Sequence, residues 1–261
     1  MRAALVVAAA FVSGCLPWRG ATPGVEGSVG LVQHGFDASS ELLPRKGQGY
    51  LAYHADAARY GAPQLVRLLK RVAARVAAAR PGATTLVGDL SAPCGGFIAG
   101  HRSHRSGRDA DLGFFTTDRR GRSTSSRPGA RFDRFGVGER DGEVLRFDTD
   151  RNWLLVEALL DDPEARVQWI FVSRGLKALL IAWALAHGRD LGLVERAASV
   201  LHQPEGSPPH DDHFHVRVYC PQDAAACVDD GPVWSWVEGE RRQGRAPGDA
   251  ELLGWAFEGL R

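Results

Sequence analysis

The 261-residue sequence lacks an excess of charge of either sign, since 32 Lys and Arg residues stand against 31 Asp and Glu residues and leave a formal net charge of +1. A chain so balanced has no overall field that would draw it to nucleic acid, so nucleic acid is not an expected partner. Hydrophobic residues make up 44% and charged residues 24%, which excludes a disordered or fibrous chain. We see no internal repeat, and one sizeable core is expected.

The N-terminus lacks a hydrophobic run long enough to cross a membrane. The run Ala3 to Val12 is about half as long as the roughly 20 residues of a spanning helix. With Arg2 before it and small residues after it, the run predicts a secretion signal. Val12-Ser13-Gly14-Cys15 resembles the bacterial lipobox, which implies cleavage before Cys15 and lipid on its thiol and new amino terminus. The alternative is a plain signal peptide with an incidental cysteine.

Cysteine is also scarce, with four in the chain. Export makes the three cysteines after Cys15 candidates for disulfides, because thiols outside the cytosol tend to be oxidised. Cys220 and Cys227 can close a short loop after a predicted strand. Cys94 then has no partner, and in its stretch of small residues we expect a buried thiol of low reactivity.

Apolar spacing predicts both helices and strands. Apolar residues recur at helical spacing between Pro63, which suits a first helical turn, and the stop signal Pro81-Gly82. Two more helices are expected, one over 153–160 and one around 176–184. Strands are expected over four stretches, which are 84–88, 109–115, 167–172 and 213–219.

These elements do not alternate strictly between strand and helix, so the predicted fold class is α+β. We expect a single domain over residues 41–238, with a central, mainly antiparallel sheet that carries the functional site and is flanked by helices. A signal peptide over 1–14 and a lipidated N-terminus and tether over 15–40 are predicted before it. The segment 118–131 is expected to be a mobile loop, and residues 239–261 a linker and a short C-terminal helix.

Five of the nine histidines lie in two short clusters that also contain aspartates. Imidazole and carboxylate are what a catalytic zinc site needs, typically as three protein ligands with a fourth position open to water. Any one of these histidines alone could be a surface residue beside acidic neighbours, but His-x₆-Asp with a downstream His-x-His favours a zinc site. The clusters contain His101, His104, Asp109, Asp111, His210, His213 and His215.

Strand alternation indicates how the two clusters could meet. It places His213 and His215 on one face of their predicted strand, with the apolar residues on the other face. In the other predicted strand it places Asp109 and Asp111 together. If the two strands are neighbours and His104 arrives from the preceding loop, one metal ion can bridge them. Spacing alone leaves Asp109 as a rival of Asp111.

A longer pattern joins these clusters: Ser-His-x₂-Gly-x₃-Asp followed by His-x-His. In it the chain resembles the penicillin-insensitive murein endopeptidases, within the wider group of zinc peptidases that includes the D-alanyl-D-alanine carboxypeptidases and dipeptidases. Further similarity lies in Gly88-Asp89-Leu90, Gly100-His101, 169–172 and 215–221, and the resemblance extends from about Tyr50 to Glu238. The residues that match the pattern are Ser103, His104, Gly107, Asp111, His213 and His215.

The resemblance implies roles for the site residues. His104, Asp111 and His215 are the implied ligands of one Zn²⁺ ion. His213 is the implied catalytic residue beside the metal, suited to moving protons, and His210 could stabilise the oxyanion. Cys220 and Cys227 resemble a disulfide of the family.

Some roles stay open at this point. His101 is expected either to line the site or to hydrogen bond to a ligand, and Asp109 is expected beside the ligands or the substrate. The carboxypeptidase and dipeptidase branches resemble each other in having a Glu shortly before the second His pair as the general base. This chain has His210-Asp211-Asp212 there, so the base is open between His213, His210 and these two aspartates.

The predicted function is that of a zinc metallopeptidase which hydrolyses peptide cross-links of the D-alanyl-meso-diaminopimelyl type in bacterial peptidoglycan. Two alternatives remain: a D-alanyl-D-alanine dipeptidase or carboxypeptidase, and a non-catalytic wall-binding lipoprotein. The expected partners are the peptide stems of peptidoglycan, and a membrane through the N-terminal lipid only. The expected location is the periplasm, with the lipid in the outer membrane.

Overall fold

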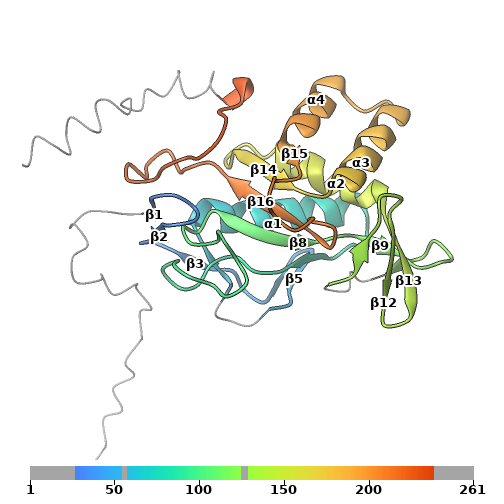
Figure 1. The fold of residues 1–261 in the computed structure, drawn as a ribbon, viewed down its shortest axis with the longest axis horizontal. Coiled ribbons are helices and arrows are strands. Elements are labelled where there is room, and N and C mark those ends of the chain that lie inside the picture. Colours follow the sequence, from blue (N-terminus) through green and yellow to red (C-terminus); the bar gives the residue numbers. More distant parts are fainter. Residues whose placement is uncertain (1–26, 55–57, 125–128, 238–261) are drawn as a thin grey trace, which may run out of the picture.

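The computed structural model describes residues 27–54, 58–124 and 129–237 and is built around a mixed sheet of seven strands (Figure 1). The strand order is β15-β14-β16-β8-β7-β5-β4. The pairs β14/β15 and β5/β7 are parallel, and the other four neighbouring pairs are antiparallel. The predicted α+β class with a mainly antiparallel central sheet is therefore confirmed.

The strands of the central sheet are short and come from the whole described chain. They are β4 (Lys46–Gly47), β5 (Tyr50–Ala52), β7 (Thr85–Val87), β8 (Asp109–Gly113), β14 (Val167–Phe171), β15 (Leu201–His202) and β16 (His213–Val218). The helices that accompany them are α1 (Pro63–Ala79), α2 (Thr149–Leu160), α3 (Arg174–Ala186) and α4 (Leu191–Val200), and the last described residues, 235–237, are also helical.

Smaller sheets complete the described structure. A five-stranded sheet has the order β10-β9-β13-β12-β11. Two strand pairs, β1 with β2 and β3 with β6, precede the first helix. The strands are β1 (Ser28–Val29), β2 (Phe36–Asp37), β3 (Glu41–Leu42), β6 (Tyr60–Gly61), β9 (Thr116–Thr117), β10 (Ser123–Thr124), β11 (Arg131–Phe132), β12 (Val137–Arg140) and β13 (Glu143–Phe147).

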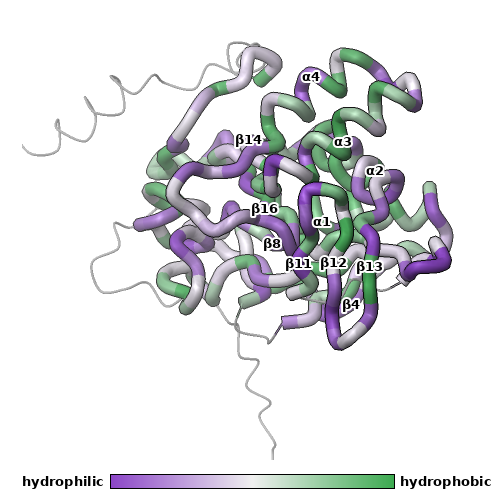
Figure 2. Tube along the Cα trace, turned by 45° about the vertical axis from the view of Figure 1, so that its right-hand side comes forward, coloured by the Kyte–Doolittle hydropathy of each residue, from purple (hydrophilic) through white to green (hydrophobic). Residues whose placement is uncertain are grey.

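The helices form where caps and apolar stripes specify them. Helix α1 begins at Pro63, and its buried stripe includes Leu65, Leu68 and Val72. Helix α2 begins after Asp148, whose side chain accepts a hydrogen bond from the Arg151 N–H at 3.0 Å. In Figure 2, green hydrophobic stretches along α3 and α4 are interrupted by paler and purple ones, the pattern of helices with one buried side.

Helix α1 lies behind β8 and β16 (Figure 1). The apolar side chains of β16, namely Phe214, Val216 and Val218, are fully buried, as are Ala110 and Leu112 of β8. Because side chains alternate along a strand, burial of these residues in the core turns the His and Asp residues of both strands to the opposite face. The sheet is thus anchored on one side and carries polar groups on the other.

Several elements differ from the expectations. Helix α4 was not predicted, and the segment expected to be a mobile loop contains β10 and the start of β11. Packed structure begins by Ser28 instead of at residue 41, because β1 pairs with β2 and Val32 is 1% exposed. The predicted signal peptide and the predicted C-terminal linker and helix over 239–261 lie outside the described residues. In the part of the chain described, no helix is long and apolar enough to cross a membrane.

Candidate metal centre

Strands β8 and β16 bring the two predicted clusters together. They are antiparallel neighbours, with His215 directly opposite Asp111 and Arg217 opposite Asp109. Directly opposite residues of an antiparallel pair point to the same face and are close enough to interact. The predicted meeting of the two strands is therefore confirmed.

His104 arrives from the loop before β8 and is fully buried. Its backbone has a positive φ of 66°, a conformation that a non-glycine residue seldom adopts unless its surroundings hold it there. The His104 N–H donates to Asp109 Oδ2 at 2.9 Å, and its ring Nδ1 lies 2.5 Å from the Leu90 carbonyl oxygen. Since a carbonyl can only accept, Nδ1 carries the proton and Nε2 keeps its lone pair for a ligand.

Three buried donor atoms converge at the sheet surface. His104 Nε2, His215 Nδ1 and Asp111 Oδ1 are each 3.3 Å from the other two. Asp111 Oδ1 is buried without a hydrogen-bond partner, which is costly unless a cation or a protonated group satisfies it. Burial alone would raise the pKa of Asp111, but His104 and His213 hold it well below its usual value. The carboxylate form is favoured, as a metal ligand requires.

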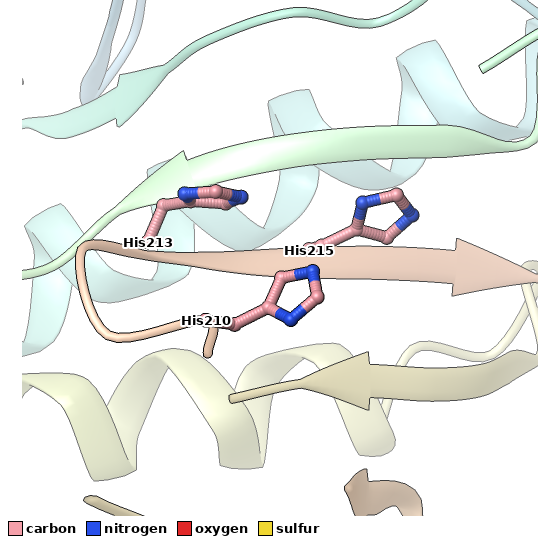
Figure 3. Close-up of side chains that lie close together, drawn as sticks. All are labelled: His210, His213 and His215. Carbon is pink, nitrogen blue, oxygen red and sulfur yellow. The ribbon is translucent and has the colours of Figure 1, made fainter. Parts of the chain in front are cut away.

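The donor atoms extend beyond these three residues. Within residues 27–54, 58–124 and 129–237, two groups of side chains could hold a metal ion, because the donor atoms of each group lie within 4.8 Å of one another. One comprises His101, His104 and Asp111. The other comprises His210, His213 and His215, whose rings lie on and beside β16, with α1 behind the strands (Figure 3). The atoms at 3.3 Å join the two groups into one continuous site.

The loop before β16 positions the second histidine cluster. The Ser173 N–H donates to the His210 carbonyl oxygen at 2.7 Å, and the Phe132 N–H donates to the Asp211 carbonyl oxygen at 2.8 Å. The Asp211 carboxylate accepts from Arg131 Nε at 2.9 Å. Asp211 is therefore committed to an ion pair away from the donor atoms, although spacing had left it as a possible base.

His213 and His210 differ in their polar surroundings. His213 Nδ1 lies 2.7 Å from Asp212 Oδ1, while its Nε2 lies 3.5 Å from Asp111 Oδ1. Burial opposes protonation of His213, but Asp111 and Asp212 raise its pKa above the usual value. His210 Nδ1 is buried without a partner, and burial together with His215 and His213 lowers the pKa of His210 to about 4. His210 is thus neutral near pH 7 and keeps a ring N–H.

Asp109, the rival ligand by spacing, lies on the far side of His215. Its Oδ1 is 3.4 Å from His215 Nε2, the ring nitrogen that points away from the converging atoms. Arg217 Nε donates to the same oxygen at 2.7 Å. Burial opposes ionisation of Asp109, but Arg217 and His215 hold its pKa well below the usual value. Asp109 is therefore placed to orient His215 and to neutralise Arg217.

On the other side of the centre, Asp89 holds two histidines. Its carboxylate lies 2.9 Å from His101 Nε2 and 2.5 Å from His54 Nδ1. His101 Nδ1 in turn lies 3.8 Å from Asp111 Oδ2. His101 thus bridges Asp89 and Asp111. It lines the site and also lies beside Asp111, which contributes one of the three converging donor atoms.

Tyr53 follows β5 and reaches the same side of the centre. A Cβ atom on Gly88 would lie 2.8 Å from Tyr53 Oη and 3.2 Å from Asp111 Cβ, so only glycine allows the two to flank this position. Burial and the charges of Asp111 and Asp89 raise the pKa of Tyr53 above its usual value, which keeps the hydroxyl protonated. The sequence reasoning missed Tyr53 as a site residue.

Comparison with known proteins identifies the family. A family model described as penicillin-insensitive murein endopeptidase matches residues 28–240. The chain belongs to this family. A penicillin-insensitive murein endopeptidase of Haemophilus influenzae is 33% identical over 227 residues, which cover 80% of this chain and 73% of that protein. Proteins of the same description from Salmonella heidelberg and Escherichia coli O157:H7 are 30% identical, covering 87% and 82% of this chain and 81% and 74% of theirs.

Membership of the murein endopeptidase family makes the chain a hydrolase. It also confirms the resemblance that the histidine and aspartate pattern indicated. The structure explains why the pattern has glycine at position 107. A Cβ on Gly107 would lie 2.7 Å from the Ala62 backbone nitrogen, and the residue has a φ of 74°, which favours glycine. The pattern thus combines polar groups of the centre with a backbone position that lets the loop before β8 pack closely.

The cysteines give one confirmation and one correction. Cys220 and Cys227 form a disulfide with an S–S distance of 2.08 Å, as expected. Cys94 was expected to be a buried free thiol, but it is disulfide-bonded and only half-buried. The expectation was wrong because it took Cys94 to be left without a partner once Cys220 and Cys227 were paired.

Proposed function

We propose that the protein is a zinc metallopeptidase that hydrolyses D-alanyl-meso-diaminopimelyl cross-links between peptide stems of peptidoglycan. The observation that carries the proposal is the triangle of His104 Nε2, His215 Nδ1 and Asp111 Oδ1, with 3.3 Å along each side. Ligand atoms of a tetrahedral zinc site at about 2.0–2.1 Å from the metal lie about 3.3–3.4 Å from one another. The triangle has the size that one zinc ion requires.

The donor set also fits a catalytic zinc ion. Two neutral imidazoles and one carboxylate are three protein ligands, the number usual in catalytic sites. The hydrogen bond from His104 to Leu90 and the Asp109 carboxylate beside His215 are the kind of outer contacts that orient metal-binding histidines. When bound, zinc would supply a Lewis acid that polarises the scissile carbonyl and lowers the pKa of the attacking water.

His213 is the proposed general base and acid. Its Nδ1–H donates to Asp212, which fixes the ring and leaves Nε2 facing the triangle, 3.5 Å from Asp111 Oδ1. From there Nε2 can take the proton of the attacking water and later deliver it to the leaving amine. Asp212 serves to orient His213 in this proposal, and Asp211 has no part because Arg131 holds it.

Two further groups are proposed to hydrogen bond to the substrate at the reacting carbonyl. His210 is neutral near pH 7 and carries a ring nitrogen that is buried without a partner. Tyr53 approaches from the opposite side of the centre and keeps its hydroxyl proton. Neutral donors fixed in this way stabilise charge that develops on the carbonyl oxygen.

Mass spectrometry of muropeptides tests the proposed function. Purified protein supplied with zinc is incubated with cross-linked tetrapeptide dimers and, separately, with pentapeptide monomers that end in D-alanyl-D-alanine. We expect the dimers to be converted to tetrapeptide monomers and the pentapeptides to remain intact. Release of terminal D-alanine alone would instead indicate a carboxypeptidase, and no change in either substrate would indicate a non-catalytic protein.

We further propose that the mature protein begins at a lipidated Cys15 and acts in the cell envelope, attached to the outer membrane. The support is the lipobox-like segment in the sequence, which lies outside the described residues. The disulfide at Cys94 stands against this proposal, because a thiol that carries lipid cannot also form a disulfide. The mass of the Cys94 peptide under non-reducing conditions therefore decides whether the Cys15 thiol carries lipid.

A further inference from the structure

A cavity of about 530 Å³ lies beside the centre, between the start of α3 and the loop that joins β15 to β16. It is lined by Ser173 and Arg174 on one side and by residues of the 203–209 loop on the other. Its volume falls within the range of about 300–1,000 Å³ that is usual for small-ligand sites. None of the residues to which the proposed mechanism assigns a role lines this cavity.

The cavity adjoins the centre on the His210 side. Pro209, which lines it, directly precedes His210, and Ser173, which also lines it, donates its backbone N–H to the His210 carbonyl oxygen at 2.7 Å. The buried ring of Phe171 lies next to both His210 and His215, with ring centroids 5.7 and 5.2 Å apart. A substrate whose scissile bond lies at the centre can therefore extend a side group into the cavity.

The cavity carries two opposite charges that do not neutralise each other. Arg174 and Glu205 both line it and are both exposed, and within the described residues neither makes an ion pair or a side-chain hydrogen bond. Both act on His202: burial is the main cause that lowers its pKa, Arg174 and Lys177 lower it further, and Glu205 opposes them. The two charges therefore lie on the same side of the molecule and are free for a ligand.

Two polar side chains that line the same cavity have hydrogen-bonding atoms without a partner. Ser173 stands at the N-cap position of α3, yet its side chain makes no capping hydrogen bond. Gln203 Oε1 is buried without a hydrogen-bond partner. A buried acceptor left unsatisfied carries a free-energy cost, which a ligand that donates a hydrogen bond would remove.

We propose that this cavity binds a free amino-acid centre of the substrate, with Arg174 pairing with its carboxylate and Glu205 with its ammonium group. Gln203 Oε1 can accept from the same ammonium group, and the Ser173 hydroxyl can donate to the carboxylate. A ligand with a carboxylate alone would leave Glu205 unpaired and repelled, so a group with both charges fits the lining best.

This inference rests on the proposed function, because the proposed substrate supplies such a group. Diaminopimelate has two amino-acid centres. The stem that provides the D-alanyl carbonyl of the cross-link uses only one centre of its own diaminopimelate in its backbone. The other centre remains free, with one ammonium and one carboxylate, close in the chain to the bond that is cut. Binding of this free amino-acid centre in the cavity would distinguish peptidoglycan stems from other peptides.

The test compares native cross-linked tetrapeptide dimers with dimers in which the free diaminopimelate centre is either amidated at its carboxyl or acetylated at its amine. The zinc-loaded full-length protein is assayed with Arg174→Gln and Glu205→Gln variants. The matched control is Arg67→Gln on α1, a side chain 52% exposed with an exposed partner, Glu164, at 3.4 Å. Binding of an uncross-linked stem tetrapeptide, followed by NMR titration, provides a readout that does not require cleavage.

We expect Arg174→Gln to lower kcat/KM on the native dimer about tenfold, mainly through KM, and to have no further effect on the amidated dimer. Glu205→Gln should behave likewise toward the acetylated dimer, and Arg67→Gln should match the wild type on all three. Equal kcat/KM for the variants and the control would overturn the cavity proposal. If Arg174→Gln lowers kcat/KM and Glu205→Gln does not, the proposed pairing with an ammonium group is wrong and the cavity binds a carboxylate alone.

Failure of the proposed function gives a different result. The wild type would then cleave no dimer, yet the tetrapeptide would still bind and both variants would weaken its binding about tenfold. In that case the cavity proposal stands without the peptidase. Binding that neither variant alters would overturn the cavity proposal independently of any cleavage.

Discussion

Replacing His213 by alanine should separate proton transfer from metal binding. The three proposed ligand atoms lie 3.3 Å from one another without any contribution from His213, whose Nε2 is 3.5 Å from Asp111 Oδ1. His213→Ala should therefore keep nearly one zinc per chain. Removing a general acid or base typically costs about 10²–10⁴ in rate, which corresponds to about 3–5 kcal/mol in the activation barrier.

Asp212→Asn is the matched variant for the orienting role. Asp212 Oδ1 accepts from His213 Nδ1 at 2.7 Å, and an amide oxygen can keep that bond but loses the negative charge. Loss of such an outer partner usually costs about 10–100-fold, so the fall in turnover should be smaller than for His213→Ala. The geometry therefore predicts that His213→Ala lowers turnover more than Asp212→Asn does.

The assay measures zinc content and turnover of cross-linked dimers on the same preparation of each protein. A His213→Ala protein that holds zinc and turns over near the wild-type rate would refute the reasoning and move the base role to His210 or Asp212. Loss of zinc together with activity would instead make His213 a ligand. Only full zinc with strongly reduced turnover agrees with the proposed role.

Three further predictions address other parts of the molecule. Tyr53→Phe should keep its zinc and lower kcat about tenfold through loss of one donor, and an unchanged kcat in steady-state kinetics would exclude the role. Asp162, 7% exposed, holds Arg71 at 2.8 Å; burial opposes its ionisation, but Arg71 and two backbone N–H groups lower its pKa overall. Its contribution is thus present above its unfolded-state pKa of about 4 and lost as pH falls through the lower folded-state pKa. Asp162→Asn should cost about 1–3 kcal/mol near pH 7 and less in acid, measured by urea unfolding at both pH values; an equal cost at both would contradict this. Cys15→Ser should move the protein from the membrane fraction to the soluble fraction, and unchanged fractionation would contradict a lipid anchor.

Much of the central sheet could be predicted because the alternation of apolar and polar residues is visible within each strand's own sequence. Alternation along 109–115 and 213–219 indicated β8 and β16 and the faces on which their His and Asp residues lie. Proline at the start and Pro81-Gly82 at the end marked α1. The five-stranded sheet was missed because several of its strands have only two residues, too few to show a period, and its β9–β13 pairing joins distant segments.

The proposed ligands could be picked out by residue type, whereas their supporting residues could not. Tyr53 and Asp89 follow β5 and β7, and only the parallel pairing of these strands and the pairing of β7 with β8 bring them to Asp111. Nothing in the local sequence marks Tyr53, and the resemblance over Gly88-Asp89-Leu90 assigned no role to Asp89. In the same way, Asp109 and Asp111 looked equivalent by spacing, and it is the partner of each carboxylate in the folded chain that distinguishes them.

The zinc content of the ligand variant tests the central claim most directly. We predict about one zinc per chain for the wild type and none for the His104→Ala, Asp111→Ala, His215→Ala triple variant. Asp109→Ala should keep most of its zinc, because Asp109 contacts His215 Nε2 and not the converging atoms. Full zinc occupancy of the triple variant, by elemental analysis of folded protein, would contradict the proposed metal centre.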